Sequence, residues 1–275
     1  MPSFRCYFLD YQGHIGAAEN FDAEHLDEAI ERALAMLKAR PHHHSIEIWQ
    51  RTLRLYASRE KAPRHQCHIY EGSPSQTLPA MAAVITRELR AKSRCMYLNS
   101  PPMVSGLKFY LASAGLDVEQ ETAKGSLILS SDREHLIEGV FDPDHMLTKL
   151  EQAVEDAEQD GYRGLWATGD MTWELGPQQC KADLLRYECR LEEVFKRRPA
   201  LSGICQYHVD TLPRDALRQS VLAHPGIFIS ETLSRVNHYY VPPPSCGRPG
   251  IDNGVLDQLI NALTGSALGN GRDEL

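Results

Sequence analysis

The hydrophobic and polar positions of the first 57 residues predict a small α+β module. Apolar and aromatic residues 4–9 suit a strand, and residues 15–18 can form the return strand of a hairpin. Apolar residues between 26 and 37 then recur at helical spacing, and Asp22 is placed to cap that helix. The alternation within residues 45–56 predicts one or two further strands. We therefore expect an independent unit at residues 1–57.

From residue 67 onward, short apolar runs alternate with amphipathic stretches. The predicted strands are residues 67–70, 94–98, 126–129, 164–168, 203–207, 227–229 and 238–241. The predicted helices are residues 78–89, 104–114, 143–160, 184–195 and 213–223. This alternation predicts an α/β domain, a mainly parallel sheet flanked by helices, at residues 67–244. A charged linker at 58–66 precedes it, and a Gly-rich C-terminal tail at 245–275 follows it, with one short helix at 255–263.

Composition and charge narrow the functional classes. Lys and Arg total 29 against 37 Asp and Glu, a net charge of −8, which argues against a surface devoted to nucleic acid. No apolar run approaches the roughly 20 residues of a membrane span, and the N-terminus lacks the apolar region of a signal peptide. The seven cysteines are scattered without a CxxC pair, so we expect reduced thiols in a cytoplasmic protein.

The turn after the first strand of the larger domain is placed where P-loop proteins hold phosphate. It contains Gly72, Ser73, Gln76 and Thr77. Gln76 stands where a P-loop has lysine, and Pro74 removes a backbone donor, so ATP hydrolysis is not favoured. The alternative is a plain helix start, with Ser73 and Gln76 forming a capping box.

Polar and aromatic residues also follow or end several predicted strands. In an open α/β sheet, ligands bind beyond the carboxyl ends of the strands. The expected ligand region is the shared rim formed by His68, Tyr70, Tyr97, Asp170, Trp173 and Tyr207. For Asp170 the alternative is capping of a loop or of the next helix, and for Trp173 it is core packing. Glu188 lies near the inward face of its helix and needs a partner there, which a ligand or a buried ion pair could supply. No Cys/His spacing matches a structural zinc site.

The order of motifs from residue 64 to 244 resembles the MEDS domain, the methanogen/methylotroph sensory domain. The motifs that carry the resemblance are His68-Ile-Tyr70, Cys95-Met-Tyr97-Leu, Leu116-Asp-Val118, Gly125-Ser-Leu127, Gly169-Asp170-Met-Thr-Trp173, Tyr187-Glu188, Cys205-Gln-Tyr207, His224-Pro225 and Asn237-His-Tyr239-Tyr240. The resemblance implies a RecA/KaiC-like fold with a degenerate P-loop. It also implies a ligand-sensing module of bacterial and archaeal signalling proteins, proposed to sense small hydrocarbon derivatives.

The family often carries a helix-turn-helix or kinase partner domain. This chain shows no convincing helix-turn-helix, so direct DNA binding is not expected. The leading hypothesis is a non-enzymatic bacterial sensory protein that binds a small organic ligand and regulates a protein partner in a transcription or kinase pathway. The alternative is a nucleotide-binding, RecA-like ATPase or phosphotransfer protein. A homo-oligomer is compatible with either.

Overall fold

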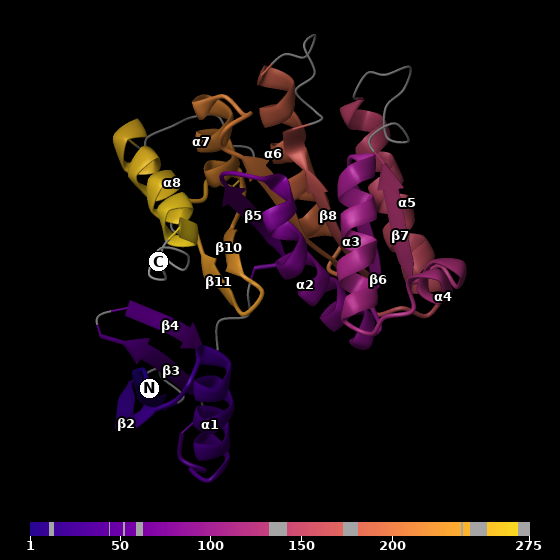
Figure 1. Ribbon diagram of the computed structural model, residues 1–275. Helices are drawn as coiled ribbons and strands as arrows, with labels where there is room; N and C mark the ends of the chain where they lie inside the picture. Colours follow the sequence, from indigo (N-terminus) through magenta and orange to yellow (C-terminus); the bar gives the residue numbers. More distant parts are fainter. Residues whose placement is uncertain are drawn as a thin grey trace, which may run out of the picture. The chain divides into compact units, whose positions relative to one another are not determined.

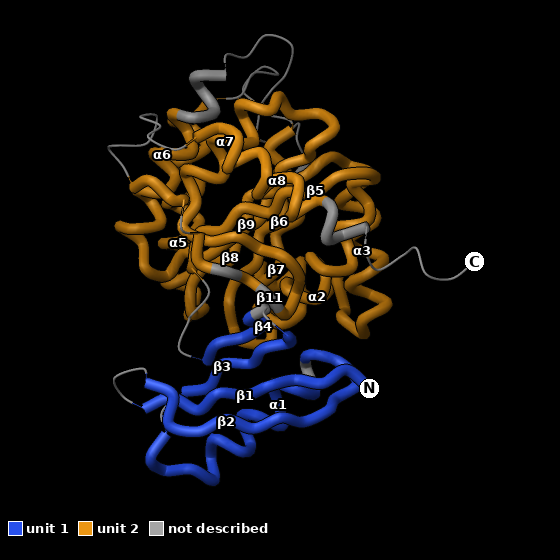
Figure 2. Tube along the Cα trace, turned by 90° about the vertical axis from the view of Figure 1, so that its left-hand side faces the viewer, with its two compact units in different colours: residues 1–62 blue, residues 63–275 orange. Residues whose placement is uncertain are grey.

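The computed structural model describes residues 1–10, 14–43, 45–51, 53–58, 63–131, 142–172, 181–237, 239–242 and 252–268. The chain divides into two compact units, Met1–Ala62 and Pro63–Leu275 (Figure 2). Each unit has its own hydrophobic core, so each is described by itself. None of the described helices is both long and apolar enough to cross a membrane.

The N-terminal unit is a four-stranded antiparallel sheet with one helix. Its strands are β1 (Ser3–Leu9), β2 (Ile15–Asp22), β3 (Ser45–Gln50) and β4 (Leu53–Ala57), in the spatial order β2-β1-β3-β4. Because side chains alternate along a strand, Phe4, Cys6 and Phe8 of β1 share one buried face. They pack in one core with Ala29 and Ala33 of α1 (Leu26–Lys38). The predicted α+β module is confirmed.

The larger unit is built on a seven-stranded sheet (Figure 1). Its strands are β5 (His65–Tyr70), β6 (Arg94–Asn99), β7 (Leu127–Ser131), β8 (Leu165–Asp170), β9 (Leu201–His208), β10 (Gly226–Ser230) and β11 (Leu233–Val236). Their order is β11-β10-β5-β9-β8-β6-β7, and every pairing except β10 with β11 is parallel. This confirms the predicted parallel sheet flanked by helices; a RecA-like origin stays a prediction.

The helices of this unit divide between the two faces of the sheet. They are η1 (Pro74–Thr77), α2 (Leu78–Arg90), α3 (Pro101–Ser113), α4 (Val118–Ala123), α5 (Pro143–Gln159), α6 (Lys181–Arg197), α7 (Arg214–Ala223) and α8 (Asn253–Leu268). Helices α2 and α3 share a core with Tyr97, Trp166 and Ile204, and lie together in front of the sheet in Figure 1. Helices α5 to α8 share the other core, with Leu165 and Tyr207.

The order of the strands explains this division. From β5 through β6 to β7 the chain moves toward one edge, and from β7 through β8 and β9 to β10 it moves back. Because parallel crossovers are right-handed, the two directions place their helices on opposite faces. The helices after β5 and β6 therefore cover one face, and those after β8 and β9 cover the other. Two pairs of neighbouring strands, β6 with β8 and β5 with β9, send their following connections to opposite faces of the sheet. Ligands of α/β sheets bind at the carboxyl ends of such pairs.

Helix α8 lies in the segment expected to be a tail, and it is longer than the short helix predicted there. Its Leu256 and Ile260 are completely buried in the core that contains α7. Asp257 accepts hydrogen bonds from Arg214 Nε at 2.8 Å and from Arg218 Nε at 2.9 Å. The hydrogen bond from Arg218, followed by that from Arg214, lowers the pKa of Asp257 to about 2. The helix is thus part of the larger unit.

Three local predictions were wrong. His25, not Asp22, caps α1, because its Nδ1 accepts a hydrogen bond from the Glu28 amide. The aromatic edge strand predicted at 238–241 is not a strand: β11 ends at Val236, Tyr239 and Tyr240 follow it, and His238 lies outside the described residues. Cys189 is disulfide-bonded rather than reduced. Because disulfide pairing depends on distances in space, the scattered spacing of the cysteines could not reveal it.

Candidate functional site

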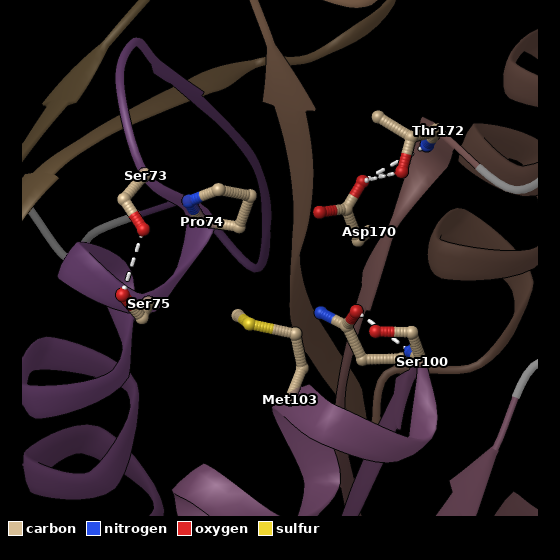
Figure 3. A pocket seen from close by; sticks show the side chains of 8 residues that line it. Ser73, Pro74, Ser75, Ser100, Met103, Asp170 and Thr172 are labelled. Carbon is tan, nitrogen blue, oxygen red and sulfur yellow. Dashed lines mark hydrogen bonds between the residues drawn. The ribbon is translucent and has the colours of Figure 1, made fainter.

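A cavity of about 370 Å³ opens at the carboxyl edge of the parallel sheet, where the connections diverge. Three segments line it: the turn after β5, the start of α3 after β6, and the end of β8. The lining residues, which define the carboxyl-edge cavity, are Ser73, Pro74, Ser75, Asn99, Ser100, Met103, Asp170 and Thr172. Figure 3 shows Pro74, Met103 and Asp170 arranged around the common space. The sequence predicted this edge of the sheet as the ligand region.

Asp170 is the charged group of the carboxyl-edge cavity. It ends β8, only 3% of its surface is exposed, and its Oδ2 accepts a hydrogen bond from the Tyr70 hydroxyl at 2.5 Å. Its Oδ1 accepts from the Thr172 amide at 2.9 Å and from the Thr172 hydroxyl at 2.6 Å. Burial and the nearby Asp170 carboxylate raise the pKa of Tyr70, so the phenol stays protonated and donates. Asp170 therefore joins β8 to β5 across the intervening β9.

The end of β6 contributes an amide and a phenol. Asn99 Nδ2 donates to the Tyr97 hydroxyl at 3.1 Å, and Asn99 Oδ1 accepts from the Ser100 amide at 2.8 Å. Burial raises the pKa of Tyr97. Tyr97 thus supports Asn99, while Asn99 and Ser100 line the cavity themselves. The sequence predicted Tyr97 but missed Asn99, although the same reasoning about strand ends would have applied to it.

The turn after β5 is held by hydrogen bonds to the segment that ends and follows β9. The Gly72 amide donates to Asp210 Oδ2 at 2.9 Å, and the Gly72 carbonyl lies 2.7 Å from His208 Nε2. Gly72 has a φ of +79°, which a side chain would strain. The Thr77 hydroxyl donates to the Pro74 carbonyl at 2.8 Å.

The predicted capping box is also wrong. Ser73 makes no side-chain bond to the helix start; its hydroxyl lies 2.8 Å from the Ser75 hydroxyl. The first turn is a short 3₁₀ helix, in which the Gln76 amide donates to the Ser73 carbonyl at 2.9 Å. The Gln76 amide, which the Ser73 hydroxyl would need in a capping box, is thus bonded to the Ser73 carbonyl instead.

Three further predicted site residues, His68, Tyr207 and Glu188, are not among the described residues that line the cavity. His68 stacks on Tyr70 with ring centroids 5.6 Å apart, inside the sheet, where burial lowers its pKa to about 4. Tyr207 and Glu188 lie on the opposite face, among α5 to α8, where the Tyr207 hydroxyl donates to Glu188 Oε1 at 2.6 Å. Burial raises the pKa of Glu188 to about 8. Trp173 lies outside the described residues.

One family model matches the chain. It is MEDS, the MEthanogen/methylotroph, DcmR Sensory domain, and it matches residues 64–225. The match spans more than half of the chain and includes every residue that lines the carboxyl-edge cavity. No curated protein matches the chain. On this match, the chain belongs to the MEDS family of sensory domains.

Proposed function

We propose that the carboxyl-edge cavity is the sensory site, and that it binds a small uncharged or cationic organic molecule such as a short alcohol, diol or amine. The observation that supports this most is the lining itself. A buried carboxylate, three serine hydroxyls, one threonine hydroxyl and one amide surround a space of about 370 Å³, while Pro74 and Met103 supply apolar contact. Small-ligand sites combine these features: a concave volume, apolar contact and a few placed polar groups.

The same lining disfavours phosphate. Among the eight described residues around the cavity there is no lysine or arginine, and Asp170 would repel an anion. Helix α3 begins with Pro101 and Pro102. Because proline lacks an N–H, this helix start has lost two of the donors that bind anions at other helix N-termini. Together with the bonded turn at Gly72, these features support a non-enzymatic sensor over a nucleotide-binding enzyme.

Signal transmission follows from the bonds of Asp170. A ligand that donates a hydrogen bond to this carboxylate competes with Tyr70, which connects the end of β5 to the end of β8, and with Thr172, which lies just after β8. Ligand binding would then favour one of two arrangements of this edge and so change the contact with a protein partner in a signalling pathway.

Replacing Asp170 with asparagine tests the site. The panel is a set of small alcohols, diols and amines, screened by thermal shift and then by calorimetry on the full chain. Hydrogen bonds to a charged group are worth about 1.5–3 kcal/mol, so we expect Asp170→Asn to weaken binding of a hit by about tenfold or more. The matched control is Asp160→Asn, since Asp160 is 61% exposed and outside the cavity. Equal affinity of both variants and the wild type would contradict this site.

The nucleotide alternative has its own expected result. A ligand present at 100 times its Kd raises the free energy of unfolding by about 2.7 kcal/mol. We expect ATP or GTP with Mg²⁺ to leave the Tm of the full chain unchanged, because the turn at Gly72 and the cavity lack a cation for the phosphates. A reproducible rise in Tm with ATP that disappears in Asp170→Asn would instead favour the nucleotide-binding alternative.

A further inference from the structure

A second polar group lies on the opposite face of the sheet from the carboxyl-edge cavity. It consists of His65 on β5, Glu188 on α6, Cys205 on β9 and His224 just after α7, named here the His/Cys/Glu cluster. All four residues are buried, with at most 6% of their surface exposed. One nitrogen, sulfur or oxygen atom from each lies within 4.8 Å of those of the other three. Four separate elements therefore converge on one point of the interior.

Both histidines are oriented by a bond on the far side of the ring. His224 Nδ1 lies 2.7 Å from the Ser220 carbonyl, which can only accept, so Nδ1 carries the proton and Nε2 keeps a lone pair. His65 Nδ1 lies 2.8 Å from Glu192 Oε2. As a carboxylate, Glu192 fixes the same tautomer, with His65 Nε2 directed to Cys205. Metal-binding histidines are held in this way, by a carboxylate or a carbonyl on the second nitrogen.

Two atoms at the centre have no hydrogen-bond partner within the described part of the chain. They are Glu188 Oε2 and His224 Nε2, and both are buried. They lie 3.4 Å apart, and no hydrogen bond joins them. Buried polar atoms are rarely left in this state, and each one costs free energy unless something binds it.

Two distances within the cluster match those between the ligands of a tetrahedral ion. With zinc bonds of about 2.1 Å to nitrogen or oxygen and about 2.3 Å to sulfur, neighbouring ligands stand about 3.4–3.6 Å apart. The distance from Glu188 Oε2 to His224 Nε2 is 3.4 Å, and that from Cys205 Sγ to His65 Nε2 is 3.6 Å. A divalent cation would also offset the negative charges of Glu188 and Glu192. Lys196 Nζ, which lies 3.8 Å from Glu192, also contributes positive charge beside that carboxylate.

We propose that His65, Glu188, Cys205 and His224 bind one divalent metal ion of the zinc class. Two imidazoles, a thiolate and a carboxylate form a borderline-soft set that suits Zn²⁺ or Co²⁺ better than Mg²⁺ or Ca²⁺. The ion would tie β5 and β9 to α6 and α7. The residues lie far apart in the sequence and in no metal motif, so spacing could not identify them.

The test uses the full chain after removal of bound metal with a chelator. Titration with Co²⁺ is expected to give one equivalent of bound ion, with visible bands typical of tetrahedral cobalt and a near-ultraviolet thiolate-to-cobalt band, and Zn²⁺ should displace it. Cys205→Ala should lose the thiolate band and bind at least tenfold more weakly. Cys67→Ala is the matched control, because Cys67 pairs with Cys205 in register on the neighbouring strand and is also buried, but is not in the cluster.

The outcomes separate a metal site from a hydrogen-bonded network. The proposal is overturned if the wild type is folded by circular dichroism but gives no thiolate-to-cobalt band. It is also overturned if Cys67→Ala and Cys205→Ala lose the band and the cobalt affinity to the same extent. If Cys205→Ala fails to fold, Glu192→Gln is the variant to test, because it leaves all four proposed ligands in place. Loss of such a supporting carboxylate weakens metal binding by about 10–100-fold, so this variant should keep the thiolate band at that lower affinity. Unchanged affinity in Glu192→Gln contradicts the proposed geometry.

Discussion

Replacing Gly203 with alanine is expected to lower the free energy of unfolding of the larger unit by about 3 kcal/mol, the upper part of the range for overpacked interiors. Gly203 lies on β9, paired with Ala167 of β8 on one side and His65 of β5 on the other. A Cβ at this position would stand 2.1 Å from the Ala167 carbonyl oxygen and 3.1 Å from its carbon. Both are backbone atoms, so no rotamer change can relieve the contact and the strands themselves must separate.

Gly169→Ala provides the matched control. Gly169 lies on the adjacent strand β8, but its added Cβ would meet Leu98 Cβ at 3.4 Å and Met171 Cε at 3.6 Å, which are ordinary contacts. We expect Gly169→Ala to change stability by less than about 1 kcal/mol. Urea unfolding, with the midpoint compared at unchanged slope, measures both variants. Equal destabilisation by the two alanines would show that close approach of β8 and β9 is not what requires glycine at 203.

The parts of the fold that could be predicted are those with a local signal. The strand predicted at 164–168, followed by Gly169-Asp170, placed Asp170 at a carboxyl end, and the same logic placed Tyr70. Helix α4 gave no signal, because none of its six residues is buried and so no apolar stripe marks it. The neighbours of Asp170 in the cavity depend on β6 lying beside β8, and strand order arises from long-range packing that no local pattern encodes.

Tyr207 shows why the faces of central strands are hard to predict. The face of a strand is normally read from alternating burial, but seven of the eight residues of β9 are buried. A strand covered on both faces has no apolar/polar alternation, so nothing in its sequence says which residues share a side. Tyr207 therefore joined the predicted rim with Asp170, although it points into the core of α5 to α8 and bonds Glu188.

Asn237 belongs to a motif that the sequence singled out, but its structural role, bonding the end of α7, could not be predicted from that motif. It is 4% exposed, and its Nδ2 donates to the carbonyls of Val221 and His224 at the end of α7. Its Oδ1 accepts from the Tyr239 amide at 3.0 Å. A helix end leaves carbonyls without partners, and here one buried amide satisfies two of them while holding the chain that follows β11. The side chain thus ties the end of α7 to the segment that follows β11.

Asn237→Ala is therefore expected to lower the free energy of unfolding by about 3 kcal/mol, because each buried carbonyl left unsatisfied costs about 1–3 kcal/mol. Asn237→Asp should be at least as damaging, since it keeps the acceptor for Tyr239 but turns a carboxylate oxygen toward the two carbonyls. Asn253→Ala, at the exposed start of α8, is the matched control and should stay within about 0.5 kcal/mol of wild type. Urea unfolding of the full chain compares the three. If Asn237→Asp were as stable as wild type, the donated bonds to Val221 and His224 would not be what stabilises this corner.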